Sequence, residues 1–533
     1  YGIRGIFSGN SLVGVLVVLE GMDSFVLLCL LGLPMLGAVI LLFVPAGALK
    51  VVKVVAVTVS FVVAVLAIYI FVSFDETAGA VQFQKIYRWL PLPGPWGAGD
   101  NAITLSLGVD GVGATMVLLT GIVMLTGTLI SWNVSEATKD FFILYFVLLA
   151  GVFGVFITFD LFFFFLFYEL SVLPMYLLIG KWGSTSQFKG FARTKEYSAM
   201  KLTLVLVAGS VLIWIAIIAI FFQAGIGTFS ILEIQEVSNS AFSPTFQNIF
   251  FPLLMVGFGI LAGLWPFHTW SPDGHVAAPT AVSMVHAGVL MKLGAFGIIR
   301  VGLVLMPIGA ETWMPLLIVL GAVNVIYGAV SAMGQTDLKY VIGYSSVSHM
   351  GYVLMGIATL NVLGMSGAVL QMFSHGIMTA LFFAVAGMIY DRTHTRDTLV
   401  LEGMAKRMGV ISVLFTVAGL TSLGLPGMSG FVAELLVFLG VFQSYGILGT
   451  VLGSLAVVGA ALTAIYILRL LSKVFFGPTP AMWESQTDSG SRELLAAGIL
   501  VAIIFSVGLW PFPYIEVIES GVNPILAMIP GAR

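Results

Sequence analysis

Five ionisable side chains stand inside apolar stretches of this 533-residue sequence. They are Glu169, Lys292, His349, His375 and Glu434. A charged side chain at the centre of a membrane costs at least about 2.5–3.5 kcal/mol, so each of these residues needs a reason to be there. Carboxylates, amines and imidazoles share the ability to bind and release a proton. The residue types and their settings therefore predict a row of proton carriers inside a membrane.

Glu169 and Lys292 lie deep within their apolar stretches. Glu169 follows a phenylalanine-rich run that begins at Phe162, and no nearby residue could bring it to water. Its carboxyl would be neutral alone and ionised beside a cation, so its protonation can be switched; a hydrogen-bonded structural carboxyl is the alternative. Lys292 is several residues from either end of its stretch. Because burial penalises the charged form, this lysine can release and accept a proton.

Two histidines and a second glutamate extend the row. His349 and His375 belong to neighbouring apolar stretches, and histidine can relay protons at neutral pH. A structural histidine is the usual alternative for one such residue, whereas two of them between a lysine and a glutamate favour a relay. Glu434 directly follows a segment rich in glycine and proline, where water could bring protons to it.

Hydropathy predicts the elements that must hold these residues. The chain is 59% hydrophobic and 9% charged, whereas soluble domains contain roughly 25% charged residues. Apolar runs of about 20 residues recur along it, each long enough to cross a membrane as a helix. We therefore expect an all-α polytopic membrane protein with about fourteen transmembrane helices. The expected helices are 24–46, 50–73, 111–131, 140–158, 160–180, 196–222, 249–270, 277–301, 311–333, 340–359, 363–390, 408–440, 447–475 and 491–515.

The connections between these helices predict the topology. The longest, at 74–110, is expected to be an ordered loop outside the membrane with a short hairpin. Lysines and arginines collect in the loops on one side of the predicted membrane, among them Lys139, Lys189 and Lys339. The positive-inside rule makes that side the cytoplasm. An even number of helices then places both termini on the outer, periplasmic side.

Two expected helices contain interruptions. The seventh contains Gly263-Leu-Trp-Pro266, and the twelfth contains Leu423-Gly-Leu-Pro426-Gly-Met-Ser-Gly430. Proline removes a backbone donor, and the freed backbone groups are tolerated only beside a protein-lined or watery cavity. Because the interruptions are five helices apart, we expect two inverted five-helix repeats with discontinuous helices 7 and 12. Two unrelated proline kinks are the alternative.

No cofactor or metal site is expected in this chain. Cys29 is its only cysteine, so neither an internal disulfide nor a thiolate cluster is possible. Sequence patterns that bind nucleotides or redox centres are missing. His268, His275 and His286 cluster around the first interruption, but the segment offers too few carboxylate or thiolate ligands for a metal. The net charge of -3 gives no reason to expect a nucleic-acid partner.

The predicted helices divide the chain into five segments. They are 1–110 with an N-terminal extension, two helices and the outer loop; 111–270 with the third helix and most of the first repeat, to the broken helix 7; 271–310 with helix 8 and the central lysine; 311–475 with helices 9 to 13; and 476–533 with helix 14.

Longer motifs surround the ionisable residues, in an order and spacing that cover most of the chain. They include Tyr168-Glu-Leu-Ser-Val-Leu-Pro-Met-Tyr, Pro266-Phe-His-Thr-Trp-Ser-Pro-Asp-Gly-His, Leu290-Met-Lys-Leu-Gly-Ala-Phe-Gly, Tyr344-Ser-Ser-Val-Ser-His-Met-Gly and Leu425-Pro-Gly-Met-Ser-Gly-Phe-Val-Ala-Glu434. With these motifs the chain resembles the antiporter-like, proton-translocating subunits of respiratory complex I, the NADH:quinone oxidoreductase. No long lateral helix of the L type is expected after helix 14, so the resemblance is to the M type.

The resemblance implies roles for the individual residues. Glu169 corresponds to the fifth-helix glutamate of the family, and Lys292 corresponds to its central eighth-helix lysine. His349 and His375 match the bridging histidines, and Glu434 matches the exit-side glutamate of helix 12. Protons would enter from the cytoplasm, pass along this row and leave on the outer side, driven by quinone reduction in other subunits.

The resemblance also implies partners and cofactors. The expected partners are the L-type and N-type antiporter-like subunits and the small K-type subunit, in the lipid bilayer of a bacterial cytoplasmic membrane. NADH or another donor, FMN, iron–sulfur clusters and quinone are expected in partner subunits. The chain would thus belong to a proton-translocating enzyme without performing redox chemistry itself.

One position departs from the family pattern. The family has a lysine about five residues before its Pro-x-His-x-Trp motif, where this chain has Leu261, and no lysine occurs between Lys201 and Lys292. Glu169 therefore lacks its usual partner cation on helix 7. We expect His286 to replace that cation in part. A His286 ring far from both Glu169 and Lys292, with no bridging water path, would contradict this expectation.

Two alternatives stay open from the sequence. A subunit of an Mrp-type sodium/proton antiporter or of a membrane-bound hydrogenase would contain the same module, and co-purifying flavin and iron–sulfur subunits with a quinone site would distinguish complex I from these. A scaffold subunit that has lost pumping with its lysine is the other alternative. It predicts that Lys292→Ala and Glu434→Gln leave the ratio of protons to electrons unchanged.

Overall fold

The computed structural model describes residues 25–78, 81–92, 102–188 and 191–532. Within these residues, thirteen helices are long and apolar enough to cross a membrane. The shorter apolar helices α16 and α17 follow one another and together supply one more crossing, which gives fourteen. The expectation of an all-α polytopic membrane protein is confirmed, and the positions of the expected helices agree with it.

The bounds of the membrane helices follow the chain in order. The first seven crossings are α2 (Val26–Phe43), α3 (Leu49–Val72), α4 (Gly111–Ile130) extended by η2 (Ser131–Asn133), α5 (Thr138–Ile157), α6 (Leu161–Trp182), α7 (Lys195–Ala224), and α9 (Pro244–Ala262) with η3 (Phe267–Thr269) and α10 (Trp270–Ala277). The eighth crossing, called helix 8 below, runs through α11 (Thr280–Val285), η4 (His286–Leu290), α12 (Met291–Gly297) and η5 (Ile298–Leu303). The remaining crossings are α13 (Pro307–Met333), α14 (Leu338–Ala358), α15 (Val362–Thr393), α16 (Gly409–Ser422) with α17 (Ser429–Gln443), α18 (Ile447–Phe475) and α19 (Ser491–Leu509).

Shorter elements connect these crossings. They are the strands β1 (Gln82–Pro91), β2 (Ala102–Val109), β3 (Ser186–Phe188) and β4 (Phe191–Arg193), the helices α8 (Ile231–Ala241) and α20 (Phe512–Ala527), and the 3-10 turns η6 (Met404–Lys406) and η7 (Ala481–Trp483). β1 pairs with β2 and β3 pairs with β4, both antiparallel. The hairpin expected in the connection 74–110 is therefore confirmed.

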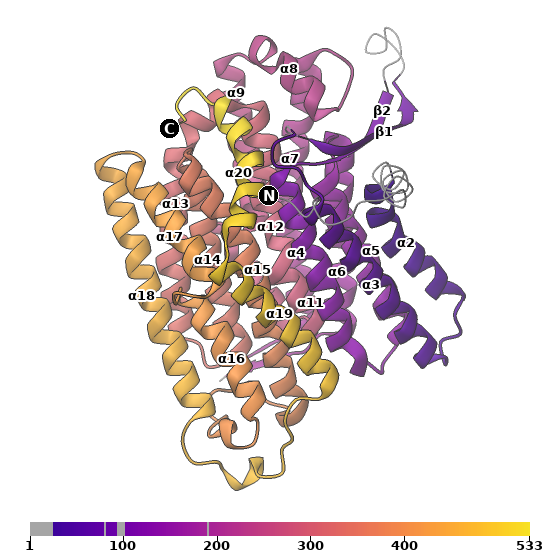
Figure 1. Ribbon diagram of the computed structural model, residues 1–533, viewed down its shortest axis with the longest axis vertical. Helices are drawn as coiled ribbons and strands as arrows, with labels where there is room; N and C mark the ends of the chain where they lie inside the picture. Colours follow the sequence, from indigo (N-terminus) through magenta and orange to yellow (C-terminus); the bar gives the residue numbers. More distant parts are fainter. Residues whose placement is uncertain (1–24, 79–80, 93–101, 189–190, 533) are drawn as a thin grey trace, which may run out of the picture.

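Both described ends of the bundle lie on the side of the β1–β2 hairpin (Figure 1). The Lys85 ammonium of β1 lies 5.8 Å from the centre of the Phe25 ring, just before α2. Near the other end, the Val517 carbonyl of α20 packs so closely on Gly111, at the start of α4, that a Cβ there would lie 1.8 Å from it. An even number of crossings requires ends on one side, and that side is the one predicted to be periplasmic.

The two interruptions predicted in crossings 7 and 12 are confirmed. Gly263, with a φ of 78°, ends α9, and Gly424 and Gly427, with φ of 67° and 92°, separate α16 from α17. Glycine adopts these left-handed conformations without steric cost. At the first interruption the Asn324 side chain of α13 accepts a hydrogen bond from the Trp265 amide at 2.6 Å and donates one to the Gly263 carbonyl at 2.8 Å. The freed backbone groups are thus satisfied inside the protein.

Helix 8 lies at the centre of the bundle and is fully buried. It packs against α4, α6 and α15 through α11 and against α5 and α9 through α12. In Figure 1, α2 and α18 form opposite edges of the bundle. Two π turns, η4 and η5, flank α12. The sequence shows a mainly apolar run here, interrupted by His286, Lys292 and Arg300, and nothing in that run predicted the π turns. Such turns occur frequently at functional sites.

The fourteenth crossing differs from the expected helix 491–515. α19 ends at Leu509, and the chain continues as α20 after a bend at Trp510 and Pro511. The residue before a proline is pushed out of the α region by the proline ring. Trp510 has φ and ψ of −137° and 75°, in agreement with this effect. The expected helix was therefore wrong at its C-terminal end.

Asp160 gives a pH-dependent prediction for the end of α6 beside the β1–β2 hairpin. Its carboxylate caps the helix by accepting hydrogen bonds from the Phe162 and Phe163 amides at 2.9 and 3.1 Å, yet burial raises its pKa to about 6. A raised carboxyl pKa favours folding below pH 4, and that contribution is lost as the pH rises through 6. Asparagine keeps the cap without the charge. Asp160→Asn is thus expected to raise the free energy of unfolding of the detergent-solubilised complex at pH 8 by at most about 3 kcal/mol, and by less at pH 5. The measurement is the melting temperature of the complex at the two pH values.

The matched control for this measurement is Asp140→Asn. Asp140 makes only an exposed ion pair with Lys181, and such pairs contribute little. If the stability gain of Asp160→Asn over the wild type does not grow between pH 5 and pH 8, burial does not raise the pKa of this carboxyl.

Candidate functional site

Lys292 lies on α12, in the turn that follows the π turn η4. Its side chain is inaccessible to solvent. The ammonium donates to the carbonyl of Ala287, which belongs to η4, and its Nζ lies 2.7 Å from Nδ1 of His375 on α15. A protonated lysine requires His375 to accept through Nδ1, whereas a neutral lysine allows the imidazole to be the donor. One proton can therefore be shared by the two side chains.

The row continues from His375 to His349 and Glu434. The rings of His375 and His349 are stacked, with centroids 5.3 Å apart and planes inclined by 24°. Nε2 of His349 on α14 lies 3.6 Å from Oε1 of Glu434 on α17. All of these side chains are buried. The structure thus brings together Lys292, His349, His375 and Glu434, from four different helices.

His349 has an acceptor at each ring nitrogen. Nδ1 is 2.8 Å from the Ser345 carbonyl, and Nε2 is 3.0 Å from the carbonyl of Ser422, the last residue of α16. Because a neutral imidazole carries a single N–H, it can donate to only one of these carbonyls, whereas the protonated ring can donate to both. Glu434 lies beside the interruption that follows Ser422, since a Cβ on Gly424 would be 2.7 Å from its Oε2. The far end of the row therefore meets the interruption of crossing 12.

Glu169 stands apart from these four residues. It lies half-buried on α6, and its Oε1 has no hydrogen-bond partner among the described residues. Leu261, in the last turn of α9, is fully buried. In the described part of the chain, no hydrogen bond or ion pair joins Glu169 to Lys292.

The ring of His286 contacts aromatic rings. Its centroid lies 4.0 Å from that of His275 and 5.4 Å from that of Trp270. Neither ring nitrogen has a hydrogen-bond partner within the described residues. No hydrogen bond there connects His286 to Glu169 or Lys292, so its role as a substitute cation stays a prediction.

His275 is a residue of this region that the sequence did not single out as a proton carrier. Its Nε2 lies 3.0 Å from the Ser271 hydroxyl and 3.3 Å from the sulfur of Met291, the neighbour of Lys292. Its ring is buried. The sequence placed His275 only in a cluster with too few metal ligands. Within the described residues, no group of three or more His, Cys, Asp and Glu side chains could hold a metal ion.

Lys339 is not in a cytoplasmic loop, as the sequence predicted, but is buried near the start of α14. Its Nζ donates to the Ala278 carbonyl at 2.8 Å and lies 3.4 Å from the Ser283 hydroxyl of helix 8. The prediction was wrong because charge counting along the chain does not register tertiary burial. Asp337, which caps α14, gave a local sign that Lys339 belongs to the helix.

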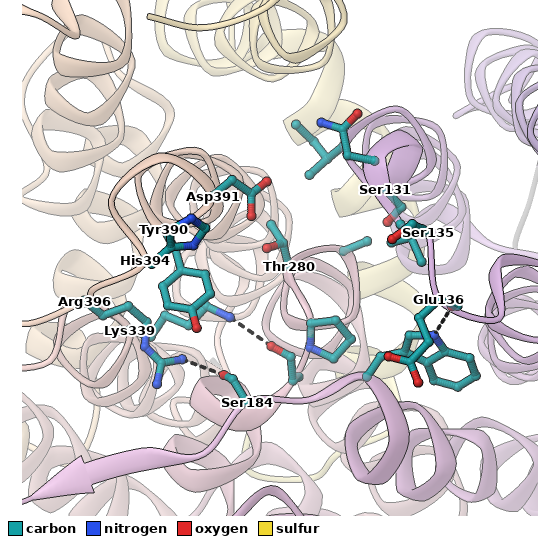
Figure 2. Close-up of a pocket in the computed structure, with 17 residues that line it drawn as sticks. Ser131, Ser135, Glu136, Ser184, Thr280, Lys339, Tyr390, Asp391, His394 and Arg396 are labelled. Carbon is teal, nitrogen blue, oxygen red and sulfur yellow. Dashed lines mark hydrogen bonds between the residues drawn. The ribbon is translucent and has the colours of Figure 1, made fainter. Parts of the chain in front are cut away.

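A cavity of about 530 Å³ opens beside Lys339, at the end of the bundle away from the β1–β2 hairpin. Asp391 and His394 line it together with Lys339, Thr280 and Arg396 (Figure 2). Figure 2 also shows the Lys339 side chain extended along the cavity toward the carbonyl that it bonds. The cavity therefore brings titratable side chains to the first turn of helix 8.

Asp273 anchors the same end of the bundle. Its buried carboxylate bonds Arg193 of β4, the Lys201 ammonium at 2.8 Å and the Tyr340 hydroxyl at 2.8 Å. These bonds tie α7, α10, α14 and the β3–β4 hairpin together.

Comparisons with known proteins agree on one family. Residues 158–463 match the sequence model of the family described as NADH:quinone oxidoreductase/Mrp antiporter, TM. The chain is 37% identical over 485 residues to NAD(P)H-quinone oxidoreductase chain 4 of Gloeobacter violaceus, covering 90% of this chain and 88% of that protein. It is 38% identical over 517 residues to NAD(P)H-quinone oxidoreductase chain 4-2 of Synechocystis sp., covering 90% and 89%.

Solved structures share the fold. A chain of respiratory complex I from Thermus thermophilus with bound NADH superposes with a TM-score of 0.83 at 24% identity, over 95% of this chain and 100% of that chain. A chain of the Mrp complex from Dietzia sp. superposes with a TM-score of 0.79 at 21% identity, over 95% and 98%.

Proposed function

Because this chain belongs to the NADH:quinone oxidoreductase/Mrp antiporter family, we propose that it is the proton-translocating M-type subunit of a complex I-type quinone oxidoreductase. The observation that carries the proposal is the buried row of four titratable side chains. Successive members are separated by 2.7 Å between Lys292 and His375, 5.3 Å between the two histidine rings, and 3.6 Å between His349 and Glu434. The chain itself performs no redox chemistry.

Each member of the row can hold the proton in turn. Lys292 and His375 share one proton, and the stacked rings carry it toward α14. The two carbonyls around His349 can accept from both N–H groups of its protonated form, and Glu434 is placed to accept the proton from Nε2. From Glu434 the interruption at Gly424 gives access to water on the way to the outer side. Each transfer is a step between positioned acids and bases.

The remaining assignments extend the same proposal. The L-type and N-type antiporter-like subunits and the small K-type subunit are the partners, and the donor, FMN, iron–sulfur clusters and quinone belong to partner subunits. The membrane is a bacterial cytoplasmic membrane, with both termini outside because the loops rich in Lys and Arg face the cytoplasm. Glu169 would contribute on the uptake side without the lysine that Leu261 replaces, with His286 as a partial substitute cation.

Glu434→Gln tests the proposal. Glutamine preserves the size of the side chain but cannot accept the proton, so transfer through this subunit is expected to slow about a hundredfold. The number of protons translocated per electron by the intact complex in liposomes should then fall, while the amount of assembled complex stays the same. Glu402→Gln, at an exposed carboxylate outside the row, is the matched control.

The outcome also separates the alternatives. An unchanged ratio in Glu434→Gln would support the scaffold function. Uptake of sodium in exchange for protons by the purified complex, without quinone reduction, would instead support an Mrp-type antiporter.

A further inference from the structure

Lys339 lies between the open cavity and the buried centre of helix 8. Its side chain lines the cavity, and its Nζ is 3.4 Å from the Ser283 hydroxyl of helix 8. Ser283 in turn donates to the carbonyl of His275 at 2.8 Å. His275 contacts the ring of His286, one turn beyond Ser283 on the same crossing. Ser283 and the His275–His286 ring pair therefore lie next to one another between the cavity and the bundle centre, although among the described residues no direct hydrogen bond joins the Ser283 hydroxyl to either ring.

Charges place His275 between the two buried lysines. The charged or titratable side chains whose fields reach His275 are His286, Lys292 and Lys339, and the field of His275 reaches His375 of the row. The groups that face Lys339 are Arg396, Asp337 and Asp391. The cavity side of Lys339 thus carries the Arg396 guanidinium together with two carboxylates, and its inner side faces Ser283 and, beyond it, the His275–His286 pair.

Several nitrogens along this route have no protein partner. Among the described residues these are Nδ1 of His275, both ring nitrogens of His286 and Nε2 of His375, all of them buried. Buried polar groups in folded proteins nearly always have a partner, and water supplies it where the protein does not. These nitrogens mark positions where water can link Ser283 and the histidines to Lys292.

We propose that the cavity and Lys339 form a proton inlet of this chain, which supplies Lys292 through Ser283 and the His275–His286 pair. The inference rests on the proposed function and identifies the uptake route of the same row. A proton from water in the cavity binds the neutral Lys339 amine; the ammonium then gives a proton to the Ser283 oxygen as the Ser283 hydroxyl proton moves on toward the histidines. One proton enters and one leaves, and every group returns to its starting state.

This route explains how protons can reach Lys292 although α9 has Leu261 where the resemblance implies a lysine. In the described residues Glu169 makes no hydrogen bond to the row, and Leu261 can neither pair with it nor pass a proton on. Lys339 offers a basic nitrogen on the correct side of Lys292 instead. The inlet therefore bypasses the position where the family lysine is missing.

Three substitutions of Lys339 separate proton transfer from a fixed charge. Arginine keeps the positive charge and the hydrogen bonds but does not release a proton near neutral pH, and glutamine keeps neither the charge nor the proton. Histidine can carry a proton. In liposomes containing the intact complex, we expect Lys339→Arg and Lys339→Gln each to slow proton uptake at least about tenfold, and Lys339→His to retain at least about half of it. Lys181→Arg and Lys181→Gln, at an exposed lysine on the same side, serve as matched controls.

The amount of assembled complex and its quinone reductase rate with an uncoupler show whether each variant folds. Wild-type proton uptake in Lys339→Arg would overturn the inlet, because a fixed charge would then suffice. Equal loss in Lys339→His and Lys339→Gln, with normal assembly, would overturn it as well. If Glu169→Gln stops uptake and Lys339→Arg does not, the supply runs through Glu169 and the inference fails. Lys292→Met in the same preparation separates the two proposals, since full translocation in that variant would contradict the proposed function itself.

Discussion

Replacing Lys292 with methionine is expected to stop proton transfer through this chain while leaving its fold intact. Methionine has a similar length and no charge, so it fills the buried site without the desolvation cost of an ammonium. It removes the only nitrogen within 2.7 Å of His375 Nδ1 among the described residues, and with it the shared proton. Removing a positioned proton carrier slows transfer by about a hundredfold or more. The measurement is the number of protons translocated per electron by the intact complex in liposomes.

Lys292→Arg and Lys406→Met sharpen this test. Arginine keeps the charge but does not release a proton, so Lys292→Arg is expected to be as defective as Lys292→Met. Lys406 is an exposed lysine outside the row, and its methionine variant should translocate normally. Normal translocation in Lys292→Arg would mean that this position supplies only a positive charge, and the row would then not be a proton path.

Asp110→Ala is expected to cause a large loss of stability at a site outside the row. Asp110 Oδ1 accepts from the Arg300 guanidinium at 2.5 Å, and both side chains are about 5% exposed. Asp110 also caps α4 by accepting from the Gly113 amide at 2.8 Å. Alanine would leave the guanidinium buried between the Phe159 and Phe296 rings without its carboxylate. Breaking one partner of a buried pair costs about 3–5 kcal/mol, so the melting temperature and the yield of assembled complex should fall.

A double variant shows whether the buried charge is the cause. Replacing a whole buried ion pair by apolar residues is often close to neutral, so Asp110→Ala combined with Arg300→Met should be more stable than Asp110→Ala alone. Lys181→Ala breaks an exposed pair and should change stability by less than about 1 kcal/mol. A double variant that is no more stable than the single variant would assign the loss to the helix cap.

The proposed uptake side of the row is where the resemblance implies a departure from the family pattern. Glu169 lies on α6, and α9 has Leu261 at the position where the resemblance implies a lysine. The structure has a second basic side chain, Lys339, at the buried start of α14, beside a cavity that contains Asp391 and His394. Protons can enter by the proposed Lys339 route and still use the same row beyond Lys292, because any entry route needs only to deliver a proton to Lys292.

Much of this protein could be predicted from its sequence because the membrane constrains local composition. Apolar runs fixed the number of crossings, since each must span the same hydrocarbon thickness. Glycine and proline located the interruptions at Gly263 and Gly424, because their backbone effects are local. The cost of burying a charge singled out Lys292 and Glu434 as candidate proton carriers, and the structure places both in the buried row.

Only the tertiary structure decided which side chains meet. Lys292 and His375 are 83 positions apart, and Asp110 and Arg300 are 190 apart, so their contacts depend on how each helix is rotated and packed against its neighbours. The π turns that flank Lys292 on helix 8 likewise left no recognisable pattern in the sequence. The burial of Lys339 also depends on tertiary contacts, among them those to the Ala278 carbonyl and the Ser283 hydroxyl. Hydropathy measures whether a residue can enter the membrane, but the rotation of a helix in a fully apolar core is set by side-chain shape and by long-range hydrogen bonds, which no local window of the sequence contains.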